Sequence, residues 1–232
     1  MMKNVKLDIA KTGIEISADI EAKAQAANAL LREEGEVKKR LLTAETNRAL
    51  FEQLDRDMER RITSLARLIN TLPEVEDPRG LTAYITLCLC HIKRRCNLFF
   101  LARQGEPLPG DELSMYLDEL AELARYGGVN TLIRCGKVGA LKLRGAALCY
   151  DFAFETISWT LREKATPLMG YLNAEGAQLV FRFLPGGDPG QWRFSQELVA
   201  AVTALGGQIA CKDLDGAYGI CLTVPLGGEA CG

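Results

Sequence analysis

The side chains best suited to chemistry in this sequence are a single histidine and two cysteines beside it. Cys88 and Cys90 form a C-x-C pattern, which differs from the C-x-x-C spacing typical of zinc sites, and no further ligands stand at a matching distance. We therefore expect no metal site. His91 lies beside a mainly apolar face, which favours a packed histidine in the core or at its boundary.

A second candidate is the turn made by Gly186, Gly187 and Asp188 after an apolar strand pattern. Glycine-rich turns that follow a strand cradle phosphates in some nucleotide-binding proteins. By itself, however, such a turn is mainly a signal for chain reversal. Whether this turn binds phosphate or only reverses the chain depends on the helices and strands around it.

The overall charge argues against nucleic-acid binding, and the placement of the cysteines argues against disulfides. A net charge of −2 and an isoelectric point near 5.7 leave no broad basic surface, so we expect no nucleic-acid partner. The basic runs at 38–40 and 93–95 lie inside helical patterns and are interpreted as solvated helix faces. The eight cysteines fall mostly in apolar patterns, which favours reduced thiols over disulfides.

No apolar run approaches the roughly 18 residues that a membrane span requires. The N-terminus also lacks the charged-then-apolar pattern of a signal peptide. We expect a soluble, cytoplasmic protein, and the 48% content of apolar residues is enough for a sizeable core.

A long helix is predicted from about Asp19 to Leu72, because this segment has no proline and only one glycine. Steps of seven along it meet an apolar residue each time: Leu30, Val37, Ala44, Phe51, Met58, Leu65 and Leu72. Such a helix is not stable alone in water, so we expect a coiled coil with a second copy. The alternative is a helix folded back on its own domain.

Proline-rich segments divide the rest of the chain. An acidic turn at 73–78 precedes a strongly apolar helical pattern from Leu81 to Ala102, and the two helices together predict a hairpin. Two further prolines and a glycine mark a linker. The expected domains are a tail at 1–18, a coiled coil and hairpin at 19–105, a linker at 106–110, a sheet domain at 111–226 and a tail at 227–232.

The sheet domain alternates helices with strands. The first expected elements are a helix capped by Asp111 and ending near Tyr126, strands at Thr131–Cys135 and Ala140–Leu143, and a buried helix at Ala146–Lys164. A hairpin is expected next, with strands at Leu168–Leu172 and Gln178–Leu184. The last expected elements are a helix at Glu197–Leu205, which Gly206 and Gly207 end, and two closing strands joined near Asp213–Gly216. This pattern predicts an α+β fold with helices on one face of the sheet.

The closing helix, its Gly-Gly stop and the final "YGICLTVPL" strand resemble the end of the GHKL (Bergerat-type) ATPase domain of sensor histidine kinases. Over about residues 45–226 the order of elements is similar to the dimerisation hairpin plus ATPase-like α/β sandwich of these kinases. The stretch "HIKRRCNLFFL" looks most like divergent kinase-like proteins of Gram-positive bacteria. The resemblance implies a dimer in two-component signal transduction.

The positions that carry chemistry in the family depart from its pattern. The alignment implied by the resemblance places Asp55 where the phosphoacceptor histidine belongs, and a carboxylate there cannot form phosphohistidine. On the second helix of the ATPase-like domain, Glu155 matches the glutamate that activates phosphoryl transfer. Trp159 stands at the position of the magnesium-binding asparagine, and Glu163 follows one turn later.

The adenine-binding loop departs as well. Pro185 occupies the aspartate position, while Gly186 and Gly187 keep the glycines and Asp188 offers a carboxylate from a shifted place. Glu155, Trp159, Glu163, Gly186, Gly187 and Asp188 are therefore interpreted as a remnant nucleotide pocket. We expect no cofactor, or ATP with magnesium if the divergent pocket functions.

The leading interpretation is a pseudokinase that acts as a dimeric signalling module, with a response regulator or an upstream sensor region as partner. One alternative is an active histidine kinase that binds ATP through a divergent pocket. Another is a phosphotransferase that uses His91, as implied by the likeness to sporulation phosphotransferases with a degenerate ATPase-like domain.

Overall fold

The computed structural model describes residues 25, 28–42, 45, 48, 52, 56, 58–76, 78–186, 193–213 and 218–226. The chain forms two compact units, Met1–Arg60 and Arg61–Gly232. In the first, residues 28–42 are helical and exposed, including the predicted seam residues Leu30 and Val37. The coiled-coil partner of this seam stays a prediction. Ala44, Phe51 and Asp55 lie outside the described residues.

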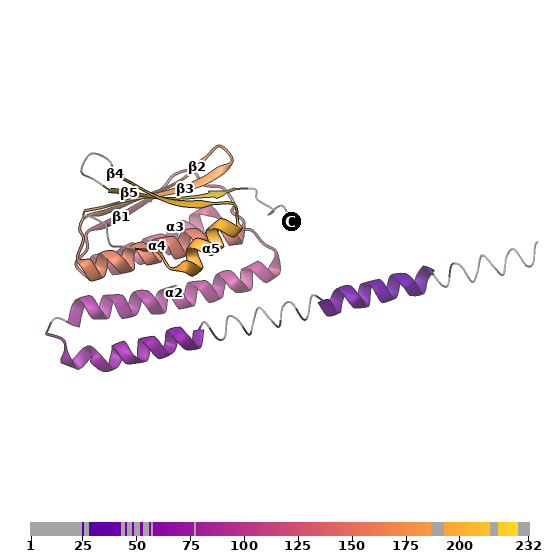
Figure 1. Ribbon diagram of the computed structural model, residues 1–232, viewed down its shortest axis with the longest axis horizontal. Helices are drawn as coiled ribbons and strands as arrows, with labels where there is room; N and C mark the ends of the chain where they lie inside the picture. Colours follow the sequence, from indigo (N-terminus) through magenta and orange to yellow (C-terminus); the bar gives the residue numbers. More distant parts are fainter. Residues whose placement is uncertain are drawn as a thin grey trace, which may run out of the picture. The chain divides into compact units, whose positions relative to one another are not determined.

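The second unit contains layers of helices and one sheet (Figure 1). Residues 61–71 are helical and lead through the short 3-10 helix η1 (Leu72–Glu74) to α2 (Pro78–Gln104). Pro73 and Pro78 explain the break, since proline lacks the amide hydrogen that a continuing helix requires. The predicted helical hairpin is therefore present, with α2 somewhat longer than its apolar pattern.

Two helices alternate with the first strand. α3 (Gly110–Tyr126) presents Leu113, Leu117 and Leu120 to the core, and β1 (Thr131–Cys135) and α4 (Leu143–Glu163) follow. The predicted cap by Asp111 is wrong, because Pro109 occupies the N-cap position and no side chain caps the helix. Asp111 lies in the first turn instead, where its negative charge still favours the helix N-terminus.

The strand predicted at Ala140–Leu143 is also wrong. Leu141 makes only an isolated bridge with Leu108, through two backbone hydrogen bonds of 2.9 and 2.8 Å. The segment thus pairs with the connection between α2 and α3 and not with the sheet, and the chain turns into α4 at Leu143.

Five strands form one mixed sheet in the order β1-β2-β3-β5-β4. β2 (Leu168–Glu175) runs parallel to β1, while β3 (Gln178–Pro185), β5 (Tyr218–Pro225) and β4 (Gln208–Asp213) are antiparallel to their neighbours. α5 (Gln196–Ala204) lies between β3 and β4 in the sequence. The predicted α+β class, a helical hairpin followed by a helix-covered sheet, is confirmed.

The hydrophobic core lies between the sheet and the helices α3, α4 and α5 (Figure 1). Phe152 of α4 packs against Phe181 and Phe183 of β3, with ring centroids 5.6 Å apart in both pairs. The same core continues into the hairpin, because Leu87 and Leu98 of α2 are buried in it. α2 is thus packed as part of the sheet-bearing unit.

Candidate functional site

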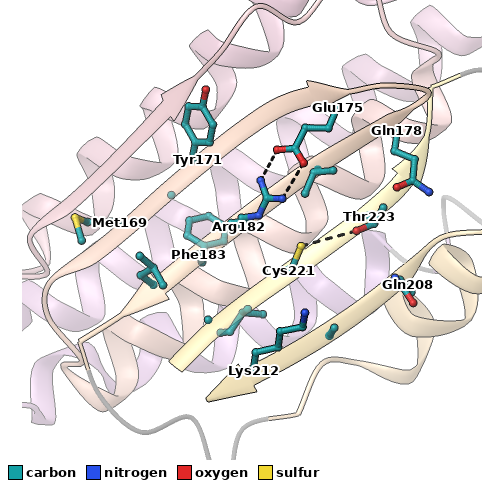
Figure 2. A pocket seen from close by; sticks show the side chains of 16 residues that line it. Met169, Tyr171, Glu175, Gln178, Arg182, Phe183, Gln208, Lys212, Cys221 and Thr223 are labelled. Carbon is teal, nitrogen blue, oxygen red and sulfur yellow. Dashed lines mark hydrogen bonds and ion pairs between the residues drawn. The ribbon is translucent and has the colours of Figure 1, made fainter. Parts of the chain in front are cut away.

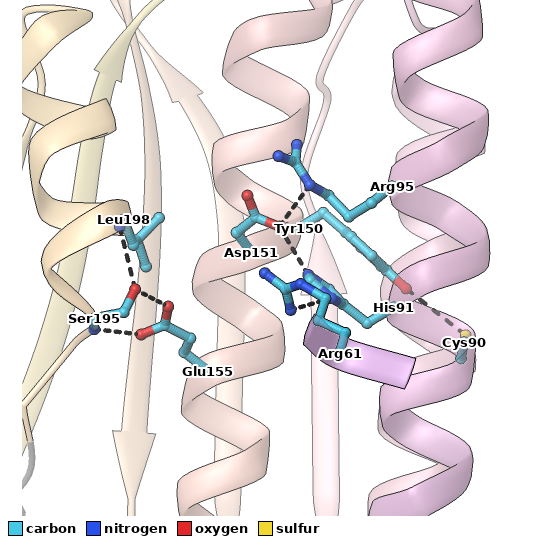
Figure 3. A network of polar contacts seen from close by, with 9 residues as sticks. All are labelled: Arg61, Cys90, His91, Arg95, Tyr150, Asp151, Glu155, Ser195 and Leu198. Atoms are coloured by element: carbon cyan, nitrogen blue, oxygen red, sulfur yellow. Dashed lines mark hydrogen bonds and ion pairs between the residues drawn. The ribbon is translucent and has the colours of Figure 1, made fainter. Parts of the chain in front are cut away.

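Glu155 holds the start of α5. One carboxylate oxygen accepts the backbone N–H of Ser195 at 2.8 Å, and the other accepts the Ser195 hydroxyl (Figure 3). The hydroxyl oxygen of Ser195 in turn accepts the backbone N–H of Leu198 at 3.1 Å, as an N-cap does. Both oxygens of Glu155 are therefore used to fix a helix end, where the helix dipole favours a negative charge.

The two residues at the following turns of α4 offer little to a metal-bound nucleotide. Trp159 is 8% exposed, and its indole has only an N–H donor, so it supplies no oxygen ligand for magnesium. Glu163 ends α4 and is exposed. The helix thus brings the predicted remnant residues into one row without making a cation site of them.

At the end of β3, Pro185 and Gly186 pack closely against the rest of the sheet domain. Pro185 is buried, and Gly186 lies so close to Thr166 that an added Cβ would come within 2.3 Å of its carbonyl oxygen. Glycine is required there by this close approach, which is a structural reason independent of phosphate binding. Gly187 and Asp188 lie outside the described residues.

His91 lies at a junction of three helical segments and is 2% exposed. Its Nε2 is 2.8 Å from Oδ1 of Asp151 on α4, and its Nδ1 is 3.3 Å from a guanidinium nitrogen of Arg61 (Figure 3). The ring also stacks on Phe154 with centroids 3.8 Å apart. Arg95 adds a second cation to the cluster, 3.3 Å from Asp151.

These contacts determine the protonation of His91. Arginine is only a donor, so Nδ1 must accept the hydrogen bond from Arg61 and Nε2 must carry the proton that it donates to Asp151. The imidazole is therefore neutral. In agreement, burial lowers the pKa of His91 below its ordinary value, and this effect outweighs the opposing influence of Asp151.

The pKa of Asp151 is also lowered, but here the partners of the carboxylate outweigh burial. Burial alone would raise its pKa, but the hydrogen bond from His91 and the charge of Arg95 outweigh burial and lower the pKa below its ordinary value. The cluster thus contains a carboxylate anion, a neutral imidazole and two guanidinium cations. No local sequence pattern links Asp151 or Arg61 to His91, so neither residue could be predicted as its partner.

The predicted absence of a metal site stays an expectation. Among the described residues, no group of three or more histidine, cysteine, aspartate or glutamate side chains is arranged to hold an ion. Burial raises the pKa of Cys90 to about 11, so this thiol is a poor source of thiolate for a metal or a nucleophile. None of the described helices combines the length and apolar composition of a membrane span.

Comparison with known proteins finds no matching family model and no matching curated protein. Among solved structures, the histidine kinase domain of the blue-light-activated histidine kinase of Erythrobacter litoralis is similar at 13% identity, with a TM-score of 0.46, over 75% of this chain and 93% of that one. The histidine kinase AdeS of Acinetobacter baumannii gives 9% identity and a TM-score of 0.41, over 74% and 98%.

A bacterial phosphotransferase is similar at 11% identity, with a TM-score of 0.43, over 73% of this chain and 91% of that one. A complex of the histidine kinase ThkA with the response regulator protein TrrA is also among the similar structures, at 12% identity and a TM-score of 0.39, over 77% of this chain and 61% of that one.

Proposed function

We propose that this chain is a histidine-kinase-like protein of two-component signal transduction that has kept the scaffold without the phosphoryl-transfer chemistry. It acts as a dimeric regulatory module, with a response regulator or an upstream sensor region as its partner. The observation that carries the proposal is the double hydrogen bond between Glu155 and Ser195. A carboxylate that caps a helix with both oxygens is not available as a base.

The residues around Glu155 support the same proposal. Trp159 fills a position where a magnesium-bound nucleotide would need an oxygen ligand, and the backbone at Gly186 is packed against Thr166. For the divergent pocket to bind ATP and magnesium, Glu155 would have to release Ser195 and expose the first turn of α5.

The shared core supports a regulatory role as well. Movement of the sheet relative to α2 would have to break the core that the two share. Here Leu87 and Leu98 of α2 are buried in the same core as the sheet residues, so α2 and the sheet resist such movement. A signal that reaches the hairpin is therefore passed directly to the sheet.

The geometry does not favour His91 as a phosphoryl carrier. Phosphorylation requires a ring nitrogen that a donor can reach, whereas in this structure the imidazole is 2% exposed and both of its nitrogens contact charged partners. A phosphotransferase would have to break the contacts with Arg61 and Asp151 at every turnover.

Calorimetry with ATP and magnesium tests the proposal. We expect no binding tighter than about 100 μM, which corresponds to roughly 5.5 kcal/mol. An ATP-binding histidine kinase domain measured in parallel serves as the positive control.

Incubation with ATP labelled at the terminal phosphoryl group gives the second readout, and we expect no acid-labile label on the protein. Tighter binding together with such label would overturn the proposal. Loss of the label in a His91→Ala variant that stays folded would then establish the phosphotransferase alternative.

A further inference from the structure

The face of the sheet opposite the helices carries a hollow that the proposed function does not use. Its volume is about 600 Å³, and side chains of β2, β3, β5 and β4 line it (Figure 2). This volume lies within the range of ligand-binding sites, about 300 to 1,000 Å³. The helices α4, which carries Glu155, and α5 cover the other face of the sheet (Figure 1).

The strand register explains the shape of the hollow. Tyr171 pairs with Arg182, Arg182 with Cys221, and Cys221 with Ala210, so one row crosses the four strands from large to small side chains. Tyr171 and Arg182 rise on one side, while Cys221 and Ala210 leave a low floor. With neighbouring strands about 4.8 Å apart, the row from β2 to β4 spans about 14 Å, the length of an extended segment of about four residues.

An apolar row lies beside this floor. Met169 pairs with Leu132 on β1 and with Leu184 on β3, and all three side chains are exposed on the same face. These three exposed side chains form a small apolar patch next to the charged side chains of the same face. A partner at this face is therefore expected to contribute apolar side chains of its own.

The charges on this face are unbalanced. Its described side chains include the cations Arg134, Arg182 and Lys212, and Glu175 as the anion. Glu175 binds Arg182 with two hydrogen bonds of 2.5 and 2.8 Å, which hold the guanidinium in place and leave three of its five N–H donors for other acceptors. Lys212 forms no hydrogen bond or ion pair with any residue that the structure describes.

We propose that this hollow is an open groove that binds an acidic segment of a partner protein. Carboxylates of the segment would contact Arg182 and Lys212, and its apolar side chains would pack on Met169 and Leu184. We infer the occupant from complementary charge, because the described side chains of this face carry an excess of two positive charges, whereas the net charge of the chain is −2. A second copy of the chain is disfavoured, since two such faces would place like charges opposite each other.

The proposal is independent of the proposed loss of phosphoryl transfer. The groove lies on one face of the sheet, and α4, the helix of Glu155, covers the other face (Figure 1), so either conclusion can fail without affecting the other.

Selection of random linear peptides displayed on phage against the full chain tests the groove. We expect recovered peptides that combine net negative charge with apolar residues. A synthetic copy of such a peptide should bind the protein in fluorescence anisotropy, and Lys212→Glu should weaken it about tenfold or more. The matched control is Lys93→Glu on α2, which makes the same charge change away from the groove and should alter affinity less than about twofold.

A chemical readout locates the peptide. Cys221 is partly exposed on the floor of the groove, so bound peptide should slow its alkylation by iodoacetamide, as measured by mass spectrometry. The proposal is overturned if the recovered peptides lack negative charge, or if Lys212→Glu leaves their affinity unchanged. It is also overturned if Lys212→Glu abolishes self-association or binding to anionic lipid vesicles while no peptide is recovered.

Discussion

At the scale of single residues, the contacts of His91 connect three helical segments that are distant in the sequence. Asp151 is 60 residues away from it along the chain, and Arg61 is 30 residues away. The Nε2–H tautomer and the Asp151 carboxylate fit this arrangement only while the imidazole is neutral. A second proton on the His91 ring would go to Nδ1, which faces the positively charged guanidinium of Arg61. The charge of Arg61 and the burial of the ring therefore both oppose protonation.

The pH dependence of stability should therefore depend on the protonation of His91, the only histidine in the chain. Its pKa is lowered in the folded protein, whereas in the unfolded chain it is near 6.5. On acidification the unfolded state gains the proton first. The free energy of unfolding should thus fall as pH drops through about 6.5, by at most about 1.4 kcal/mol per pH unit from this group.

Urea unfolding from about pH 8 to about pH 5.5 measures this effect. The His91→Gln variant keeps every carboxylate and the N-terminal amine, so subtracting its profile from that of the natural chain isolates the histidine. An identical slope in the two proteins would show that burial of His91 does not oppose its protonation.

At the scale of elements, α2 presents two different faces. Leu87 and Leu98 face the core, whereas Leu89 and Phe100 are 50% and 51% exposed and lie three helical turns apart on one stripe. The helix at 61–71 carries a matching stripe with Ile62 and Ile69. Exposed apolar stripes on both helices of a hairpin are typical of helices that pack against a second copy.

We expect the double substitution Leu89→Glu and Phe100→Glu to yield a folded monomer, because charged side chains on the stripe would oppose packing against another copy. Sedimentation equilibrium of the natural chain and the variant measures the change, and circular dichroism checks that the variant is folded. Met115→Glu on α3 is the control, since Met115 is also exposed and lies outside the hairpin. A natural chain that is monomeric at all concentrations would contradict the proposed dimer.

At the scale of the whole molecule, the core of the second unit runs without interruption from the sheet through α3 and α4 to α2. Elements that share one close-packed core unfold together, because opening one of them exposes the apolar surface of the others. The unit from Arg61 onward should behave as a single cooperative structure.

Leu87→Ala should therefore destabilise the sheet as well as α2. Deletion of a fully buried leucine side chain costs about 2 to 5 kcal/mol. Urea unfolding followed by circular dichroism and by tryptophan fluorescence should give coincident transitions shifted to lower denaturant.

The matched control is Val199→Ala on α5, where the side chain is partly exposed and the expected change is below about 0.5 kcal/mol. Separate transitions for the two probes would show that the unit does not unfold cooperatively, contrary to the shared core.

The sequence by itself determined the order of the elements from Thr131 to Pro225 apart from the segment at Ala140–Leu143, and it determined the apolar faces of the helices. These features depend on local periodicity and on proline and glycine, which act within a few residues of the chain. That Trp159 and Pro185 depart from the pattern of an ATP site stays a prediction, which rests on the resemblance to histidine kinases.

Only the tertiary structure decided which side chains meet. Glu155 and Ser195 are 40 residues apart, and their contact appears only when α4 packs beside the start of α5. The groove on the open face likewise depends on the pairing of strands that are not consecutive in the chain. Local patterns specify which face of an element is apolar, but the packing of the layers and the register of the strands select the partner of each side chain.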